Sequence, residues 1–226
     1  MDGGFPIDLI LFGMVAVFLV LRLGSVLGKR TGFEKQAAEP VAPAQPVGGT
    51  APSRPQRRVI DAVAEPPVPT RPLPAADSPI GVQLAAMAAT DRSFQTARFL
   101  DGAESAFRII VQAFADGERT RLHPLLSDDA YRAFEGAIAA REAEGHVQRT
   151  EIRSIESAVI EQAELVGTQA AITVRFVSDQ VNLTTDRAGM PVAGADAVTE
   201  MTDIWRFERN LGQPDPAWRL ISAQSA

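Results

Sequence analysis

The spacing of apolar residues changes along the chain from a helical period to a strand period. In residues 99–114, apolar side chains recur every three or four positions, which is typical of a helix with one buried face. Asp116 and Gly117 supply the turn chemistry that ends such a helix. Ser127 is a suitable N-cap for a second helix, and Gly145 is a suitable stop. This part of the chain is therefore predicted to be helical.

From residue 159 onward, apolar and polar residues alternate with a period of two, as in β-strands. Residues 159–166 and 170–177 form the first predicted hairpin, with its turn at Gly167 and Thr168. A second turn, rich in Gly and containing Pro191, is expected at residues 186–194. Two more strands are expected at residues 199–207 and from residue 218 onward. Helices followed by four antiparallel strands predict an α+β fold, in which the helices pack on one face of a curved sheet.

The N-terminal part carries a different signal, a long apolar run. Residues 5–27 contain two charged side chains, Asp8 near one end and Arg22 near the other. Because a helix rises about 1.5 Å per residue, this run is long enough to cross the apolar core of a membrane. The basic residues lie at its C-terminal side, which predicts an N-terminus outside and a C-terminal part in the cytoplasm. We therefore expect residues 1–30 to form a single-pass transmembrane anchor.

Two other interpretations of this run are a secretory signal peptide and a buried helix of a soluble domain. A signal peptide begins with basic residues, whereas Asp2 is the charged side chain that precedes the run here. A buried helix needs a packing partner, and the tract that directly follows is rich in proline. The anchor is the favoured interpretation.

Residues 31–79 contain 11 of the 16 prolines, together with many Ala, Val and Gly residues and no apolar period. Such a segment cannot bury enough apolar surface to offset its ordering entropy, so a disordered linker is predicted. Residues 80–226 have the composition of a folded domain with one core. The chain is thus divided into an anchor at 1–30, a linker at 31–79 and a domain at 80–226. It has no cysteine, which excludes disulfides.

The charge of the domain narrows the choice of partners. Residues 80–226 contain 14 basic residues, all arginine, and 21 acidic residues, so the formal charge is 14 − 21 = −7, compared with −6 for the whole chain. An acidic domain is a poor candidate for binding nucleic acid. Nucleic acid is therefore excluded as the expected partner.

The sequence has no phosphate-binding loop, dinucleotide fingerprint or nucleophile elbow. Its two histidines, His123 and His146, have neither a cysteine nor a third histidine nearby, which favours a surface or capping role over metal binding. We expect no catalytic residue, no cofactor and no metal.

Asp203 is the carboxylate of greatest interest, since it shares a strand face with Trp205 and Phe207. One interpretation is an acid in an apolar pocket, as in ketosteroid isomerases. The favoured alternative is an ion pair with Arg175 or another cross-strand arginine. Most aromatic residues at these spacings belong to a core, but some would line a concave pocket if one is open. The candidate pocket residues are Phe107, Phe114, Asp203, Trp205 and Phe207.

Several stretches of the domain together resemble the Tim44-like domain family. The resemblance is carried by FLDGAESAFRIIVQAFADGERTRLHPLLSDDAYRAFEGAI at residues 99–138, and by AAITVRFVS at 170–178, DIWRFER at 203–209 and WRLISA at 218–223. The mitochondrial member of this family anchors the import motor at the inner-membrane translocase. An N-terminal span with a Pro/Ala-rich linker is similar to the alphaproteobacterial members, which are described as adaptors.

The resemblance implies a cone-shaped α+β fold of the cystatin and nuclear-transport-factor-two type, with a concave apolar pocket and a binding role rather than catalysis. The long charged region that precedes this domain in the mitochondrial protein is replaced here by a Pro-rich tract, which puts motor recruitment in doubt.

We therefore expect an adaptor tethered to a bacterial inner membrane, which binds a protein or lipid and contributes to protein translocation, assembly or chaperone recruitment. The alternatives are a pocket enzyme of the ketosteroid isomerase type, which would use Asp203, and a lipid-binding domain. The identity of the partner and the oligomeric state stay open.

Overall fold

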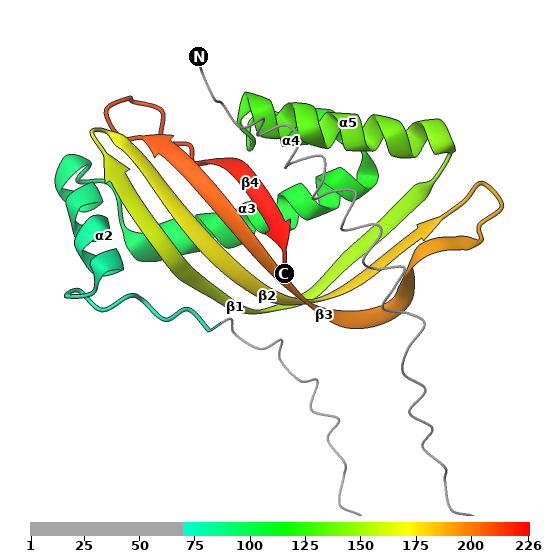
Figure 1. The fold of residues 1–226 in the computed structure, drawn as a ribbon, viewed down its shortest axis with the longest axis horizontal. Helices are drawn as coiled ribbons and strands as arrows, with labels where there is room; N and C mark the ends of the chain where they lie inside the picture. The colour runs from blue at the N-terminus through cyan, green and yellow to red at the C-terminus, as the bar shows by residue number, and fades with distance from the viewer. Residues whose placement is uncertain (1–69) are drawn as a thin grey trace, which may run out of the picture.

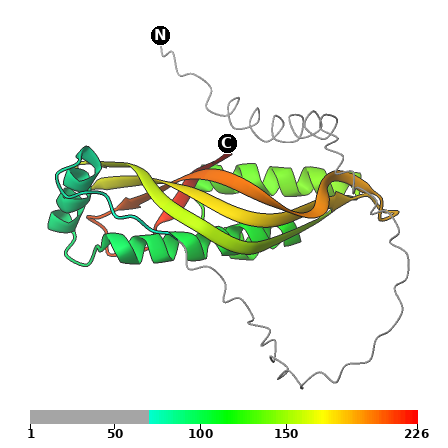
Figure 2. The same cartoon turned by 90° about the horizontal axis from the view of Figure 1, so that it is seen from below.

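The computed structural model describes residues 70–226, and these residues form one helical layer packed on one sheet. The helices are α2 (Pro79–Thr90), α3 (Thr96–Asp116), α4 (Arg119–Leu122) and α5 (Asp128–Glu144). The strands are β1 (Val147–Val166), β2 (Gln169–Thr185), β3 (Pro191–Asn210) and β4 (Arg219–Ser225). Helices α3 and α5 lie on the same side of the curved sheet, while α2 and the β2–β3 hairpin lie at opposite ends (Figures 1 and 2).

The helix ends follow the predicted local chemistry. Gly117 and Gly145 end α3 and α5 with φ angles of 72° and 73°, a left-handed conformation that glycine adopts without a Cβ penalty. The side chain of Ser127 accepts a hydrogen bond from the backbone N–H of Ala130 and caps α5. These three predictions from the sequence are confirmed.

The four strands form an antiparallel sheet in the order β1-β2-β3-β4, which confirms the predicted α+β fold with a four-stranded sheet. Strand β1 begins at Val147, well before the predicted residue 159. Its register against β2 shifts three times, and each shift interrupts the alternation that reveals a strand. Strand β3 begins at Pro191, inside the predicted turn. The sequence pattern does not reveal this start, because most of the first residues of β3 are exposed and lack an apolar face.

The core lies between α3 and the sheet. Its fully buried large side chains come from every layer and include Phe107 and Ile110 on α3, Ile172 and Phe176 on β2, and Phe207 on β3. The predicted apolar face of β2, which consists of Ala170, Ile172, Val174 and Phe176, is fully buried. Burial of these side chains is the main force that holds the helices on the sheet.

Residues before the expected domain boundary at residue 80 make contacts with the domain. Thr70 donates its backbone N–H to the carbonyl of Glu156 at 2.8 Å, and the N–H of Ala158 donates to the carbonyl of Thr70 at 3.1 Å. Ser78 caps α2 by accepting a hydrogen bond from the N–H of Gly81 at 3.0 Å. Residues 70–79, which the sequence predicts to be part of the linker, therefore contact the domain through Thr70, Arg71 and Ser78.

The predicted anchor at 1–30 and the predicted linker up to residue 69 lie outside the described residues. Within the described part, no helix combines the length and the apolar character that a membrane span requires.

Candidate functional site

Asp203 is a buried carboxylate on the side of the sheet that faces the helices. The register of the strands places it in one row with Phe176 on β2 and Ser225 on β4. Its exposed fraction is 9 %. The hydroxyl of Ser225 donates to its Oδ1 at 2.7 Å, and the amide of Gln180 donates to its Oδ2 at 3.4 Å. Burial raises the pKa of Asp203 above its ordinary value, while these two hydrogen bonds act in the opposite direction.

Asp203 belongs to a chain of hydrogen-bonded side chains that crosses the sheet from β4 to β1. Gln180 also donates to Ser178 at 2.9 Å and accepts from Asn182 at 3.1 Å. Thr150 on β1 donates to the Oδ1 of Asn182 at 2.7 Å, and Gln148 donates to Thr150 at 3.2 Å. We call the following residues the polar network: Gln148, Thr150, Ser178, Gln180, Asn182, Asp203 and Ser225.

The polar network is deeply placed. Thr150, Ser178 and Gln180 are all buried, with exposed fractions of 4 % or less. Buried polar groups are costly unless they are hydrogen-bonded, and here each of them has a partner. The network therefore links all four strands through side-chain hydrogen bonds.

Aromatic rings fill the space beside Asp203. Phe107 on α3 stacks on Phe176 with a centroid distance of 4.6 Å and contacts Trp205 at 4.7 Å. Trp205 in turn contacts Phe207 at 6.2 Å, and all four rings are buried. Four of the five predicted pocket residues, Phe107, Asp203, Trp205 and Phe207, thus belong to the helix-facing side of the sheet and the helix that packs on it.

Phe114, the fifth predicted pocket residue, lies at the junction of α3 and α5. Its ring makes an edge contact with Phe134 on α5 at 5.2 Å, and the guanidinium of Arg141 lies 5.2 Å from its centroid. The structure therefore does not bring Phe114 into the group around Phe107. That the five residues line a ligand pocket stays a prediction.

The expected ion pair between Asp203 and Arg175 is wrong. Arg175 pairs in register with Ile204, and its Nε donates to Glu161 on β1 at 2.6 Å. It is Phe176 that lies opposite Asp203. Because neighbouring residues of a strand point to opposite faces of the sheet, Arg175 and Asp203 are on different sides.

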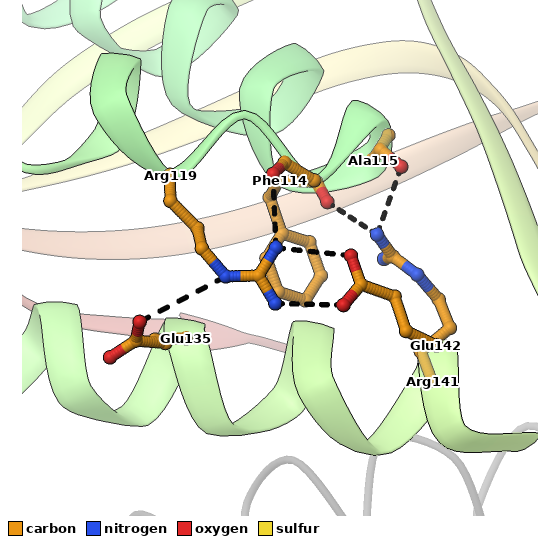
Figure 3. Close-up of polar contacts among 7 residues, drawn as sticks. Phe114, Ala115, Arg119, Glu135, Arg141 and Glu142 are labelled. Atoms are coloured by element: carbon orange, nitrogen blue, oxygen red, sulfur yellow. Dashed lines mark hydrogen bonds and ion pairs between the residues drawn. The ribbon is translucent and has the colours of Figure 1, made fainter.

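Two arginines hold α5 against the end of α3 (Figure 3). Arg119 on α4 makes a forked pair with Glu142, at 3.0 and 2.8 Å. Arg141 donates from Nη2 to the carbonyls of Phe114 and Ala115, at 2.8 and 2.9 Å, and from Nη1 to Gln148 of the polar network. A cation suits the carbonyl end of a helix, so Arg141 joins the polar network to the end of α3.

The surroundings of Arg141 and Glu142 shift the pKa values of both side chains. Burial lowers the pKa of Arg141, and the charge of Glu142 opposes that effect. The hydrogen bond from Arg119 lowers the pKa of Glu142, because it stabilises the charged form of this carboxylate.

Two open hollows lie away from the candidate pocket residues. One, of about 420 Å³, lies near the β3–β4 turn and is lined in part by Ser127, Glu208 and Arg219. The other, of about 320 Å³, lies between α3, α4 and β1 and is lined in part by Arg108 and Ile152. Both carry charges of mixed sign.

The histidines take local roles in the structure. The ring of His123 packs edge-on against Tyr131 at 4.8 Å, and the Nδ1 of His146 lies 3.0 Å from Glu144. Within residues 70–226, no group of three His, Cys, Asp or Glu side chains is placed to hold a metal ion.

Gln180 and Ser225, the two donors to Asp203, were not predicted from the sequence. A signal for Gln180 was present, because Ser178, Gln180 and Asn182 continue the same alternation as the buried residues Val174 and Phe176. Polar residues that continue a buried face indicate a buried polar network. Ser225 gave no such signal, since its contact depends on how β4 pairs with β3.

The sequence that forms these helices and strands matches a known protein family. The family model of the Tim44-like domain matches residues 81–225, from the first turn of α2 to the end of β4. The chain belongs to the Tim44-like domain family. In this Tim44-like domain, the polar network and the aromatic group both lie within the matched residues. No curated protein sequence matches the chain significantly.

Solved structures similar to this Tim44-like protein include the intermembrane space region of the chloroplast protein ARC6, with 15 % identity and a TM-score of 0.44, covering 58 % of this chain and 97 % of that chain. An NTF2-like protein from Cytophaga hutchinsonii has 11 % identity and a TM-score of 0.34, with coverages of 59 % and 98 %. A ketosteroid isomerase-like protein from Erwinia carotovora has 12 % identity and a TM-score of 0.30, with coverages of 56 % and 93 %.

Proposed function

We propose that this protein is a membrane-tethered adaptor, whose Tim44-like domain binds a protein segment at the cytoplasmic face of a bacterial inner membrane. Membership of the Tim44-like domain family supports a binding role related to protein translocation, assembly or chaperone recruitment. The apolar run at residues 5–27 supports the membrane tether, and the basic residues that follow it support a cytoplasmic domain.

The hydrogen bonds that Asp203 accepts favour a binding function over catalysis. Each of its oxygens accepts a hydrogen bond, one from Ser225 on β4 and one from Gln180 on β2. A general base must reach a substrate proton, whereas this carboxylate joins three strands to one another. It is therefore suited to maintaining the shape of a binding domain.

A tether contributes to such a function by confinement. A domain held near the membrane by a flexible linker meets membrane-bound partners at an effective concentration of roughly millimolar. At that concentration, a modest affinity is sufficient to keep the domain bound to a partner, and weak binding lets it exchange one partner for another.

Crosslinking followed by pull-down from detergent extracts tests the proposal. The full-length protein is compared with a control that carries residues 1–69 alone, so that both share the apolar run. We expect specific partners with the full-length protein only. If both recover the same proteins, the domain contributes no binding and the adaptor function fails.

Topology requires its own test. A C-terminal fluorescent-protein fusion should be bright, and a C-terminal alkaline phosphatase fusion should be inactive, because the latter enzyme is active only outside the cytoplasm. The reverse result would place the domain on the other side of the membrane and exclude cytoplasmic partners.

A second candidate function, a pocket enzyme that uses Asp203 to move a proton, is favoured by one observation. Burial raises the pKa of this carboxyl, as in isomerases that keep an acid in an apolar site. This candidate predicts turnover of a small apolar substrate that Asp203→Asn abolishes. A binding role predicts that the same variant keeps its partners in the pull-down.

A further inference from the structure

Glu104 on α3 is a second buried carboxylate, and it lies outside the polar network. Its exposed fraction is 6 %. The guanidinium of Arg71 donates to both of its oxygens, with a distance of 2.7 Å from Nη2 to Oε2, and also pairs with Asp101 one turn away. A forked pair of this kind is stronger and more directional than a single charged hydrogen bond. Two carboxylates of α3 thus recognise one arginine side chain.

The residue before Arg71 is held through its main chain. Thr70 forms a parallel bridge with Ser157, in which it donates to the carbonyl of Glu156 and accepts from the N–H of Ala158. Strand β1 lies at the edge of the sheet, so main-chain groups on its outer side are free to pair, and those of Glu156 and Ala158 pair with Thr70. Main-chain pairing beside a side-chain subsite is a common way in which proteins recognise extended peptides.

The segment that carries these two contacts has little else to hold it. Most residues between Arg71 and Ser78 are exposed, and Leu73 is 56 % exposed. Segments with few buried apolar contacts open at low free energy. Opening would nevertheless leave Glu104 buried without its counter-charge, which is strongly unfavourable. The site therefore favours an exchange, in which another cation replaces Arg71 as it leaves.

We propose that Thr70 and Arg71 occupy, within the same chain, a peptide site formed by residues 156–158 of β1 together with Asp101 and Glu104. An extended segment of a partner protein that carries an arginine displaces them and takes the same contacts. Arginine is required rather than lysine because its planar fork matches both oxygens of Glu104. This inference rests on the proposed adaptor function and specifies the chemistry of its partner.

The test uses the full-length protein in detergent and a fluorescent peptide with the sequence PVPTRPLPA of residues 67–75. In wild type the chain's own Arg71 competes with the peptide. Arg71→Ala vacates the subsite and should bind the peptide at least about tenfold more tightly than wild type, because the competing intramolecular state is removed. Adding Glu104→Gln to Arg71→Ala should abolish the gain. Arg108→Ala, an exposed arginine of the same helix, should behave as wild type.

A peptide with citrulline in place of arginine, which keeps the shape and loses the charge, is the ligand control. The proposal is overturned if Arg71→Ala gains no affinity, or if it binds the citrulline peptide equally well. Circular dichroism and thermal melting show whether each variant is folded.

Hydrogen exchange on wild type gives a measurement that needs no variant. Saturating peptide should expose the amide of Thr70 while the amide of Ala158 stays protected, since the peptide replaces Thr70 as its acceptor. No change at Thr70 would contradict the displacement. A partner recovered equally by wild type and by Glu104→Gln in the pull-down would leave the adaptor function standing and exclude this site.

Discussion

Ser225 on β4 donates its hydroxyl hydrogen to Asp203 on β3 at 2.7 Å, and this bond is where the polar network reaches the fourth strand. Strand β4 pairs with β3 only between Asp203 and Glu208, so the bond lies at the end of a short ladder. It gives β4 a side-chain contact near the end of its backbone pairing, and it supplies the shorter of the two hydrogen bonds that Asp203 accepts.

Ser225→Ala removes this donor. We expect the free energy of unfolding to fall by about 1 kcal/mol, which is typical of one lost hydrogen bond to a buried group. The pKa of Asp203 should rise further, because a hydrogen bond that stabilises its charged form is gone. Chemical denaturation and NMR titration measure the two effects. Ser222→Ala, at a β4 position that pairs with Arg206, is the matched control and should change neither.

Asp203→Asn should alter how stability depends on pH. The folded pKa of Asp203 lies above its ordinary value of 3.8, so the folded state holds the proton more tightly than the unfolded state. The contribution of Asp203 is therefore most favourable at low pH and is lost as the pH rises from the ordinary value through the folded pKa. Denaturation at several pH values between about 4 and 7 should show this loss in wild type and not in Asp203→Asn. Parallel curves for the two proteins would show that the carboxyl is not shifted.

Arg141→Met should weaken the junction of α3 and α5. The variant leaves the carbonyls of Phe114 and Ala115 without their charged donor, and we expect a loss of about 2–3 kcal/mol in the free energy of unfolding. Arg119→Gln removes a more exposed pair and should have a clearly smaller effect, which added salt reduces further. Equal losses in urea denaturation would contradict the assigned role of Arg141.

Trp205→Ala tests whether the aromatic group is core. Trp205 is 4 % exposed and contacts Phe107, Phe176 and Phe207, so we expect a loss of about 3–5 kcal/mol. Phe114→Ala, at a partly buried ring, should cost less. A nearly neutral Trp205→Ala would indicate that this ring faces an open pocket rather than a packed interior.

Truncation tests where the domain begins. Removal of residues 1–69 should leave a cooperatively folding domain, since the buried core and the contacts of Thr70 and Arg71 are formed within residues 70–226. Removal of residues 1–79 also deletes the cap at Ser78, a loss of about 1 kcal/mol, and leaves Glu104 without Arg71. The shorter protein should therefore melt at a lower temperature. Identical melting temperatures would restore the boundary at residue 80.

Features fixed by neighbouring residues were predictable. The end of α3 at Gly117 and the cap at Ser127 follow from chemistry within one helical turn. The buried face of β2 and the position of Asp203 on the same face as Trp205 follow from strict alternation along a strand. The family was also recognisable, because its matching stretches span the helices and the sheet.

Features that join distant segments were decided by the tertiary structure. The sequence could place Asp203 on a face but could not choose its partners, because the register of β2 against β3 determines whether Arg175 or Phe176 lies opposite. Strand β1 was underestimated because its bulges break the alternation. The contacts of Thr70 and Arg71 join a segment far away in the sequence to the free edge of β1 and to helix α3. Turns, caps and faces are set by local chemistry, whereas a shift of one residue in register exchanges the two faces of a strand and changes every partner across it.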